Sequence, residues 1–141
     1  MLYYPILKEW ELYFDRDDGY ENRTKVVEAF TNFWSKPWIK ELGIPGKCVL
    51  GGKVFQSESF KDGDEIFTSS VKFVEKISFD NICGVRHDLI CATTASGSKY
   101  YFYSDDHSGL MFLMLGDMIH LGRISDSRVY LKPEYRDSNF I

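Results

Sequence analysis

The pattern of hydrophobic and polar positions changes along the chain and predicts first a helix, then strands, then a second helix. The clearest helical signal lies in residues 22–36, where apolar residues recur at helical spacing: Val26, Val27, Phe30, Phe33 and Trp34. This spacing places them on one face of an amphipathic helix. We expect Asn22 or Thr24 to cap its N-terminus and Pro37 to end it.

The segments on either side of this helix carry weaker signals. Residues 2–14 fit a strand through the alternation of Trp10, Leu12 and Phe14 with polar positions, and they also fit a helical face. Residues 15–19 are polar and end in glycine, which is typical of a turn. Residues 37–42 fit a short second helical turn that ends at Gly43.

Residues 47–104 are rich in β-branched and aromatic residues, which favour strands. We expect strands at 47–55, 66–79, 89–94 and 99–103, with a bulge at Gly51 and Gly52 and a loop at residues 80–88. Residues 95–98 predict a hairpin turn in which Gly97 takes a positive φ. This region therefore predicts an antiparallel β-meander or a small barrel.

The C-terminal part predicts a second helix at residues 106–121, apolar almost all round, followed by a short strand at 128–131. Asp105, Asp106 or Ser108 would cap this helix. An all-round apolar helix is buried or lies at an interface, and residues 110–121 could join two copies of the chain. The segregated helices and strands predict an α+β fold in a single domain over residues 1–141.

Composition and charge narrow the range of partners. The chain has 141 residues, a net charge of -4 and no cluster of five or more basic residues, which disfavours nucleic-acid binding. The N-terminus does not resemble a signal peptide, and the apolar run at residues 110–115 is too short to cross a bilayer. Three cysteines, an odd number without paired spacing, predict reduced thiols and a cytoplasmic location.

Aromatic residues make up 16% of the chain and supply the first candidate contact surface. We expect Phe30 and Phe33 to pack between helix and sheet, whereas Trp34 and Trp38 are candidates for a binding surface. Tyr101 lies in a strand whose side chains alternate between two faces. Because one face must be core, we expect Tyr101 or a neighbouring tyrosine at the surface.

The candidates for chemistry are a few histidines, cysteines and acids. Cys83, His87 and Cys91 are spaced four apart, but a structural zinc site needs a fourth ligand and usually a closer pair. We interpret them as two buried cysteines and an exposed loop histidine, and we predict no metal and no cofactor. Asp105 and Asp106 beside His107 could form a general-base site, but capping of the following helix is favoured.

Anion binding is the remaining polar possibility. Arg86, Arg123 or Arg128 could hold an anionic small molecule in a cleft of the sheet, with His87 beside Arg86. The sequence contains no G-x-S-x-G, G-x-G-x-x-G or P-loop motif, so no catalytic residue is assigned.

Part of the β-rich region resembles a pattern in small uncharacterised bacterial and phage proteins. The stretch, residues 51–102, covers about a third of the chain. Its matching elements are Asp62-Gly63, Ile66, Thr68-Ser69, Val71, Val74, Thr93-Thr94, Ser96-Gly97-Ser98 and Tyr100. The resemblance implies a bacterial or phage origin and a compact β core, and it implies no activity.

Three functions follow from these observations, in order of preference. The first is a non-enzymatic binding protein with a protein partner, in the special case a stoichiometric inhibitor of a host or defence protein. The second is a small-molecule or nucleotide binder. The third is a small hydrolase using His87 or His107 with a neighbouring carboxylate, which would require convergent groups that the sequence does not assemble.

Overall fold

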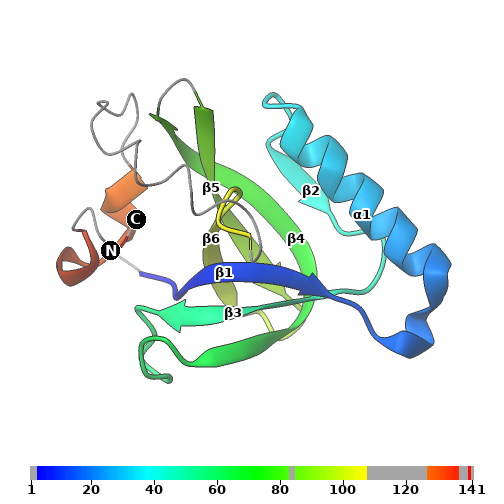
Figure 1. The fold of residues 1–141 in the computed structure, drawn as a ribbon, viewed down its shortest axis with the longest axis horizontal. Helices are drawn as coiled ribbons and strands as arrows, with labels where there is room; N and C mark the ends of the chain where they lie inside the picture. The colour runs from blue at the N-terminus through cyan, green and yellow to red at the C-terminus, as the bar shows by residue number, and fades with distance from the viewer. Residues whose placement is uncertain (1–2, 83–84, 108–126, 137–139, 141) are drawn as a thin grey trace.

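The computed structural model describes residues 3–82, 85–107, 127–136 and 140 (Figure 1). Within them, the chain forms one α-helix, α1 (Gly19–Ser35), and six strands. The strands are β1 (Ile6–Tyr13), β2 (Glu41–Gly43), β3 (Val49–Phe55), β4 (Glu65–Ile82), β5 (Val85–Thr94) and β6 (Lys99–Tyr103). The predicted α+β class is confirmed.

The six strands form one sheet that closes on itself. Their order is β2-β4-β3-β1-β6-β5, and β4 also pairs with β5, so five strands form a ring. All pairings are antiparallel except that of β1 with β6, where Ile6 faces Tyr101. Hydrogen bonds from Tyr101 N to Pro5 O (2.8 Å) and from Trp10 N to Asp106 O (3.1 Å) continue this seam. The strands therefore form a closed sheet rather than an open meander.

The long strand β4 organises the sheet. Its first part pairs with β3 and its later part pairs with β5, while β2 extends the edge beyond β3 by pairing with residues 73–75. The register of β3 on β4 shifts between Val49 and Gly51, which confirms an irregularity at the predicted bulge. The turn after β5 contains Gly97 at φ 86°, as predicted.

The helix α1 begins earlier than predicted. A 3-10 turn, η1 (Arg16–Asp18), leads directly into α1 at Gly19, so neither predicted cap residue lies at the helix start. Asn22 instead donates to Lys47 O (2.9 Å) and accepts from Lys47 N (2.7 Å), and Thr24 donates to Tyr20 O (3.0 Å). The predicted end before Pro37 is confirmed. Neither α1 nor any other helix in the described ranges has the length and apolar composition of a membrane-crossing helix.

Two groups of buried side chains hold the fold together. The first lies between the sheet and α1, where Val26, Phe30 and Phe33 join buried residues of β1, β3, β4, β5 and β6. From β2, the partly buried Leu42 packs against this group. The second lies on the other face of β1, β5 and β6, under the C-terminal segment. Its buried members are Ile6, Leu89, Cys91, Tyr101, Tyr103 and Leu131. Figure 1 shows η4 (Ser127–Tyr130) and η5 (Pro133–Tyr135) on the side of the sheet away from α1.

Three predicted elements differ from the structure, and a fourth lies almost wholly outside the described residues. Residues 37–42 do not form a helical turn, because Glu41–Gly43 finds pairing partners on the free edge of β4. Residues 80–82 and 85–88 belong to β4 and β5 rather than to the predicted loop, with Asp80 opposite His87. Residues 128–131 are not a strand, because η4 packs over the second core. The predicted helix at 106–121 lies almost wholly outside the described residues.

Candidate binding surface

An exposed aromatic pair lies on the outer face of the closed sheet. Tyr13 ends β1 and Phe67 lies in β4, and their ring centroids are 4.9 Å apart with an interplanar angle of 79°. Between them runs β3, in which Gly51 faces Glu11 on one side and Phe67 on the other. A Cβ atom on Gly51 would lie 2.5 Å from Cε2 of Tyr13 and 3.0 Å from the Phe67 ring. The glycine therefore leaves room for the two rings to meet across β3, and we call Tyr13, Gly51 and Phe67 the aromatic shelf.

The two rings remain accessible even though they touch. Tyr13 is 40% exposed and Phe67 is 66% exposed. Aromatic rings can stabilise a sheet by covering a glycine, as these rings cover Gly51. This structural role does not require the Phe67 ring to stay mostly exposed to water. Adjacent exposed aromatic rings are typical of surfaces that bind another molecule.

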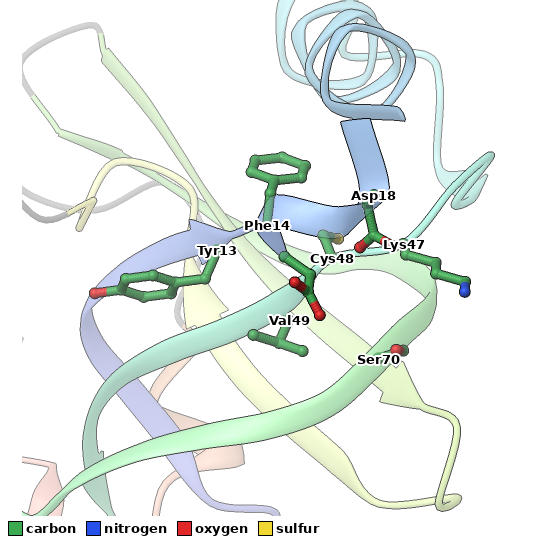
Figure 2. Close-up of a pocket in the computed structure, with 8 residues that line it drawn as sticks. Tyr13, Phe14, Asp18, Lys47, Cys48, Val49 and Ser70 are labelled. Carbon is green, nitrogen blue, oxygen red and sulfur yellow. The ribbon is translucent and has the colours of Figure 1, made fainter. Parts of the chain in front are cut away.

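A hollow of about 390 Å³ adjoins the shelf at Tyr13 (Figure 2). It is lined by Tyr13, Phe14, Asp15, Asp18, Lys47, Cys48, Val49 and Ser70. Figure 2 shows the side chains of Tyr13 and Lys47 at opposite sides of this hollow, with Cys48 and Val49 between them. The shelf and the hollow therefore form one continuous surface that begins on β1 and β3 and reaches the start of α1.

Acidic side chains surround this surface. The Tyr13 hydroxyl donates a hydrogen bond to Oε2 of Glu11 at 3.0 Å. That bond, with some burial and the negative charges of Glu11 and Glu65, raises the pKa of Tyr13 above its usual value. Lys53 is held in an ion pair with Glu9 at 2.6 Å. The surface therefore combines apolar rings with carboxylates.

The tryptophans predicted as contact residues differ in exposure. Trp34 is half-buried and stacks on Phe30 with centroids 4.9 Å apart, and its ring also contacts Trp10 at 5.3 Å. Trp38, just beyond α1, is 72% exposed. Phe30 and Phe33 are buried between helix and sheet, as predicted. Of the two predicted tryptophans, only Trp38 offers a largely open ring.

The prediction that Tyr101 or a neighbour lies at the surface is wrong for the residues from Tyr101 to Tyr103. Tyr101 is 4% exposed, and its ring packs against Tyr4 and Tyr130 at centroid distances of 5.4 and 5.7 Å. The assumption that one face of β6 is open fails because the C-terminal segment covers that face. Burial also raises the pKa of the Tyr101 hydroxyl.

The polar candidates on β5 gather, but not in an open cleft. His87 is 5% exposed rather than a surface loop residue, and its Nδ1 contacts Oδ2 of Asp105. Arg86 donates from Nε to Asp88 Oδ1 at 2.8 Å and lies over the Phe79 ring at 3.9 Å. Arg123 lies outside the described residues, as does the side chain of Arg128. Of the three arginines predicted to bind an anion, Arg86 is therefore the one whose side chain the structure describes, and it already pairs with the Asp88 carboxylate.

The His87–Asp105 pair has the form of an imidazole oriented by a carboxylate. A general base must reach the proton it removes, and a ring this buried offers little room for a substrate. Nε2 of His87 makes no hydrogen bond to any residue that the structure describes. The neighbouring Asp106 accepts from Glu9 N at 3.2 Å, and burial raises its pKa from 3.8 to about 6. Asp105 thus contacts a residue of β5 and Asp106 a residue of β1. The helix that they were expected to cap lies outside the described residues.

The thiols show no sign of activation where the structure describes them. Cys48 and Cys91 are free and buried, and burial raises the pKa of each thiol to about 11. A reactive cysteine requires a lowered pKa, so both are inert in the folded state. Cys83 lies outside the described residues. In the described part of the chain, no three His, Cys, Asp or Glu side chains are arranged to hold a metal ion.

The aromatic shelf was not singled out from the sequence, although part of its signal was visible. The alternation in β1 places Tyr13 with Glu11 on the polar face, opposite Trp10 and Leu12. Phe67 stands between Ile66 and Thr68, both buried, so its outward direction also follows from alternation. Their meeting depends on the pairing of β1, β3 and β4, which the sequence does not specify.

The fold and this surface define a mixed α+β protein with a closed sheet, an aromatic shelf and an acidic rim. In comparisons with known proteins, no family model, no curated protein and no solved structure matches the chain.

Proposed function

We propose that this protein is a non-enzymatic binding module whose aromatic shelf docks a protein partner. The observation that carries the proposal is the contact between Tyr13 and Phe67 across Gly51, which keeps two large rings together and exposed. A stoichiometric inhibitor of a host or defence protein is a special case of this function, and it would use the same surface.

The energetics of ring burial support this choice of surface. Fully burying an aromatic side chain contributes about 1.5–3 kcal/mol. Tyr and Phe have few rotatable bonds, and rings already in contact lose little freedom when a partner covers them. Two adjacent rings thus provide the core of a small interface, and the surrounding polar side chains form its rim.

The test is capture of a partner from the native host by the immobilised full-length chain, followed by mass spectrometry. The wild type is compared with Phe67→Ser and with the control Trp38→Ser. Trp38 follows the C-terminal end of α1, whereas the hollow beside the shelf adjoins its N-terminal end, and a helix of 17 residues is about 25 Å long. We expect Phe67→Ser to lose the partner and Trp38→Ser to retain it. Loss only in Trp38→Ser would move the interface to the predicted tryptophan surface and overturn the shelf as its location.

The hollow beside Tyr13 supports a second candidate function, small-molecule binding. Its volume of about 390 Å³ lies in the range of ligand sites, roughly 300–1,000 Å³. The carboxylates of Asp15 and Asp18 line it together with one amine, that of Lys47. This lining favours a cationic or neutral ligand over the anionic one expected from the sequence. A thermal-shift screen of metabolites, repeated with Tyr13→Ser, distinguishes this function from protein docking.

A further inference from the structure

We propose that the aromatic shelf recognises a basic, extended segment of a protein partner, with a lysine or arginine side chain lying over the rings of Tyr13 and Phe67. This inference rests on the proposed function and specifies the chemistry of the partner. It is carried by the joint placement of the rings, the carboxylates around them and the hollow beside them.

The carboxylates of Glu11 and Glu65 lie on the same outer face as the rings. Glu11 faces Gly51 across β1 and β3 and accepts the hydrogen bond of the Tyr13 hydroxyl. Glu65 precedes Phe67 by two residues in β4, and alternate residues of a strand share a face. Both charges act on Tyr13, since both raise the pKa of its hydroxyl. The rings therefore lie between two acids.

The positive groups near this surface do not balance its acids. Lys53 is paired with Glu9 at 2.6 Å and also lies opposite Glu65 in the pairing of β3 with β4. Arg23 lies over the Phe14 ring at 5.6 Å. Lys47 lies at the far side of the hollow, which Asp15 and Asp18 also line. Glu11 and Glu65 add two further carboxylates at the shelf itself. Lys72 adds a fourth cation, because its charge acts on the Cys48 thiol that lines the hollow. The five carboxylates, counting Glu9, still outnumber these four cations by one.

This combination selects among the classes of molecule that bind exposed rings. The face of an aromatic ring attracts a cation, and carboxylates nearby strengthen that preference. A nucleic-acid strand also stacks on rings, but its phosphates would meet carboxylates here. A second copy of the chain, joined symmetrically through the same patch, would bring acid against acid. A basic peptide is the occupant whose charge complements the surface.

An extended backbone fits the arrangement of shelf and hollow. Because Tyr13 belongs to both, the two features are continuous. Alternate side chains of an extended peptide are about 7 Å apart on one face. One basic side chain over the rings therefore leaves the next same-face side chain free to reach the hollow beside Tyr13. The Asp15 and Asp18 carboxylates would then contact a second basic group.

The experiment is fluorescence anisotropy with labelled peptides of about twelve residues, long enough to span such a surface in extended form. The probes alternate arginine with glycine, so that successive arginines share one face of an extended peptide, with glutamine–glycine and glutamate–glycine repeats as matched controls. We expect the arginine probe to bind about tenfold or more tightly than the glutamine probe, and to weaken when salt rises from about 50 to about 200 mM. The glutamate probe should bind most weakly.

Variants of the chain separate the contributions of charge and ring. The double variant Glu11→Gln/Glu65→Gln should weaken binding of the arginine probe about fivefold or more, whereas Glu28→Gln/Glu58→Gln removes two exposed carboxylates elsewhere and should not. Phe67→Leu keeps an apolar side chain and removes the ring, so it should weaken the arginine probe more than the glutamine probe. Circular dichroism melts confirm that each variant is folded.

Several outcomes would overturn the inference, and they are distinguishable from failure of the proposed function. Equal binding of the arginine and glutamine probes, no binding up to about 1 mM, or tighter binding of a single-stranded oligonucleotide each contradicts basic-peptide recognition. A dimer by light scattering that Phe67→Ser dissociates would identify a second copy as the occupant. If host-partner capture depends on Phe67 but not on Glu11 and Glu65, the proposed function stands and this inference fails.

Discussion

Oε1 of Gln56 accepts a hydrogen bond from the backbone N–H of Lys132 at 2.6 Å, which joins the end of β3 to the C-terminal segment. The same side chain donates from Nε2 to Tyr4 O at 2.8 Å and to Tyr130 O at 3.1 Å. Gln56 is 1% exposed and holds a positive φ of 64°. The buried Gln56 amide therefore links the N-terminal segment, the end of β3 and the C-terminal segment, all of which pack against the second core.

Replacing this amide should destabilise the whole fold. In Gln56→Leu the carbonyls of Tyr4 and Tyr130 and the N–H of Lys132 lose their partner in a partly buried place. Such a loss costs about 1–3 kcal/mol for each fully buried group. Because water reaches these three groups in part, we expect a smaller total, a fall of about 2–4 kcal/mol in the free energy of unfolding. Urea titration measures it. The matched control Glu58→Ala, at an exposed turn position, should stay within about 0.5 kcal/mol, and an equal effect of both substitutions would contradict the role of Gln56.

The adjacent glycines Gly51 and Gly52 should respond differently to alanine. A Cβ on Gly52 would lie 2.9 Å from the backbone oxygen of Lys8 and 3.3 Å from Cα of Trp10, which cannot move without disturbing β1. A Cβ on Gly51 meets the end of the Tyr13 ring, which can swing away.

We therefore expect Gly52→Ala to lower the free energy of unfolding by about 2 kcal/mol or more. Gly51→Ala should cost less than about 1 kcal/mol and weaken binding at the aromatic shelf by displacing a ring. Thermal melts of both variants and peptide anisotropy for Gly51→Ala check this pair. The opposite ranking of stabilities would show that the strand pairing around β3 is wrong.

Lys76 anchors the C-terminal end of α1 to the sheet. Its Nζ donates to the carbonyl oxygens of Phe33 and Lys36 and lies over the Phe33 ring at 4.4 Å. Lys76→Met keeps most of the stem and removes these contacts, which should cost about 1.5–3 kcal/mol, the range for hydrogen bonds to a charged group. Hydrogen exchange should accelerate in the last turn of α1. Lys72→Met, an exposed lysine of the same strand, is the control and should leave that turn unchanged.

The raised pKa of Asp106 predicts how stability depends on pH. Burial raises it from 3.8 to about 6, so between these values the folded state binds more protons than the unfolded state. Wild-type stability should then fall as pH rises from about 4 to about 6 and stay level above, by on the order of 1–3 kcal/mol.

Asp106→Asn retains an oxygen for Glu9 N and removes the charge. We expect this variant to melt at the wild-type temperature near pH 4 and at a higher temperature at pH 7. Melting curves across this range measure the effect. A wild type whose stability rises between pH 4 and 6, in parallel with the variant, would show that Asp106 ionises without cost.

Much of the fold follows from local patterns. The spacing of Val26, Phe30 and Phe33 predicted the buried face of α1, and the turn at residues 95–98 predicted the hairpin before β6. These predictions depend on interactions between residues a few positions apart, which a sequence displays directly. Two of the errors involve partners far along the chain, because Glu41 pairs with Glu75 and Tyr101 packs against Tyr130. A third concerns residues 80–82 and 85–88, which look like part of a polar loop but belong to the pairing of β4 with β5, where Arg86 and Asp88 form an ion pair.

By itself, the sequence determined the class of fold and the buried face of α1, because each follows from local patterns of apolar residues. Residues 2–14 fitted either a strand or a helical face, so the outward direction of Tyr13 and Glu11 depended on the pairing of β1. The tertiary structure alone decided that Tyr101 and His87 are buried and that Tyr13 meets Phe67 across Gly51. The physical reason is that burial and contact depend on which strands pair and what covers each face. In a sheet that closes on itself, those partners are separated by tens of residues along the chain.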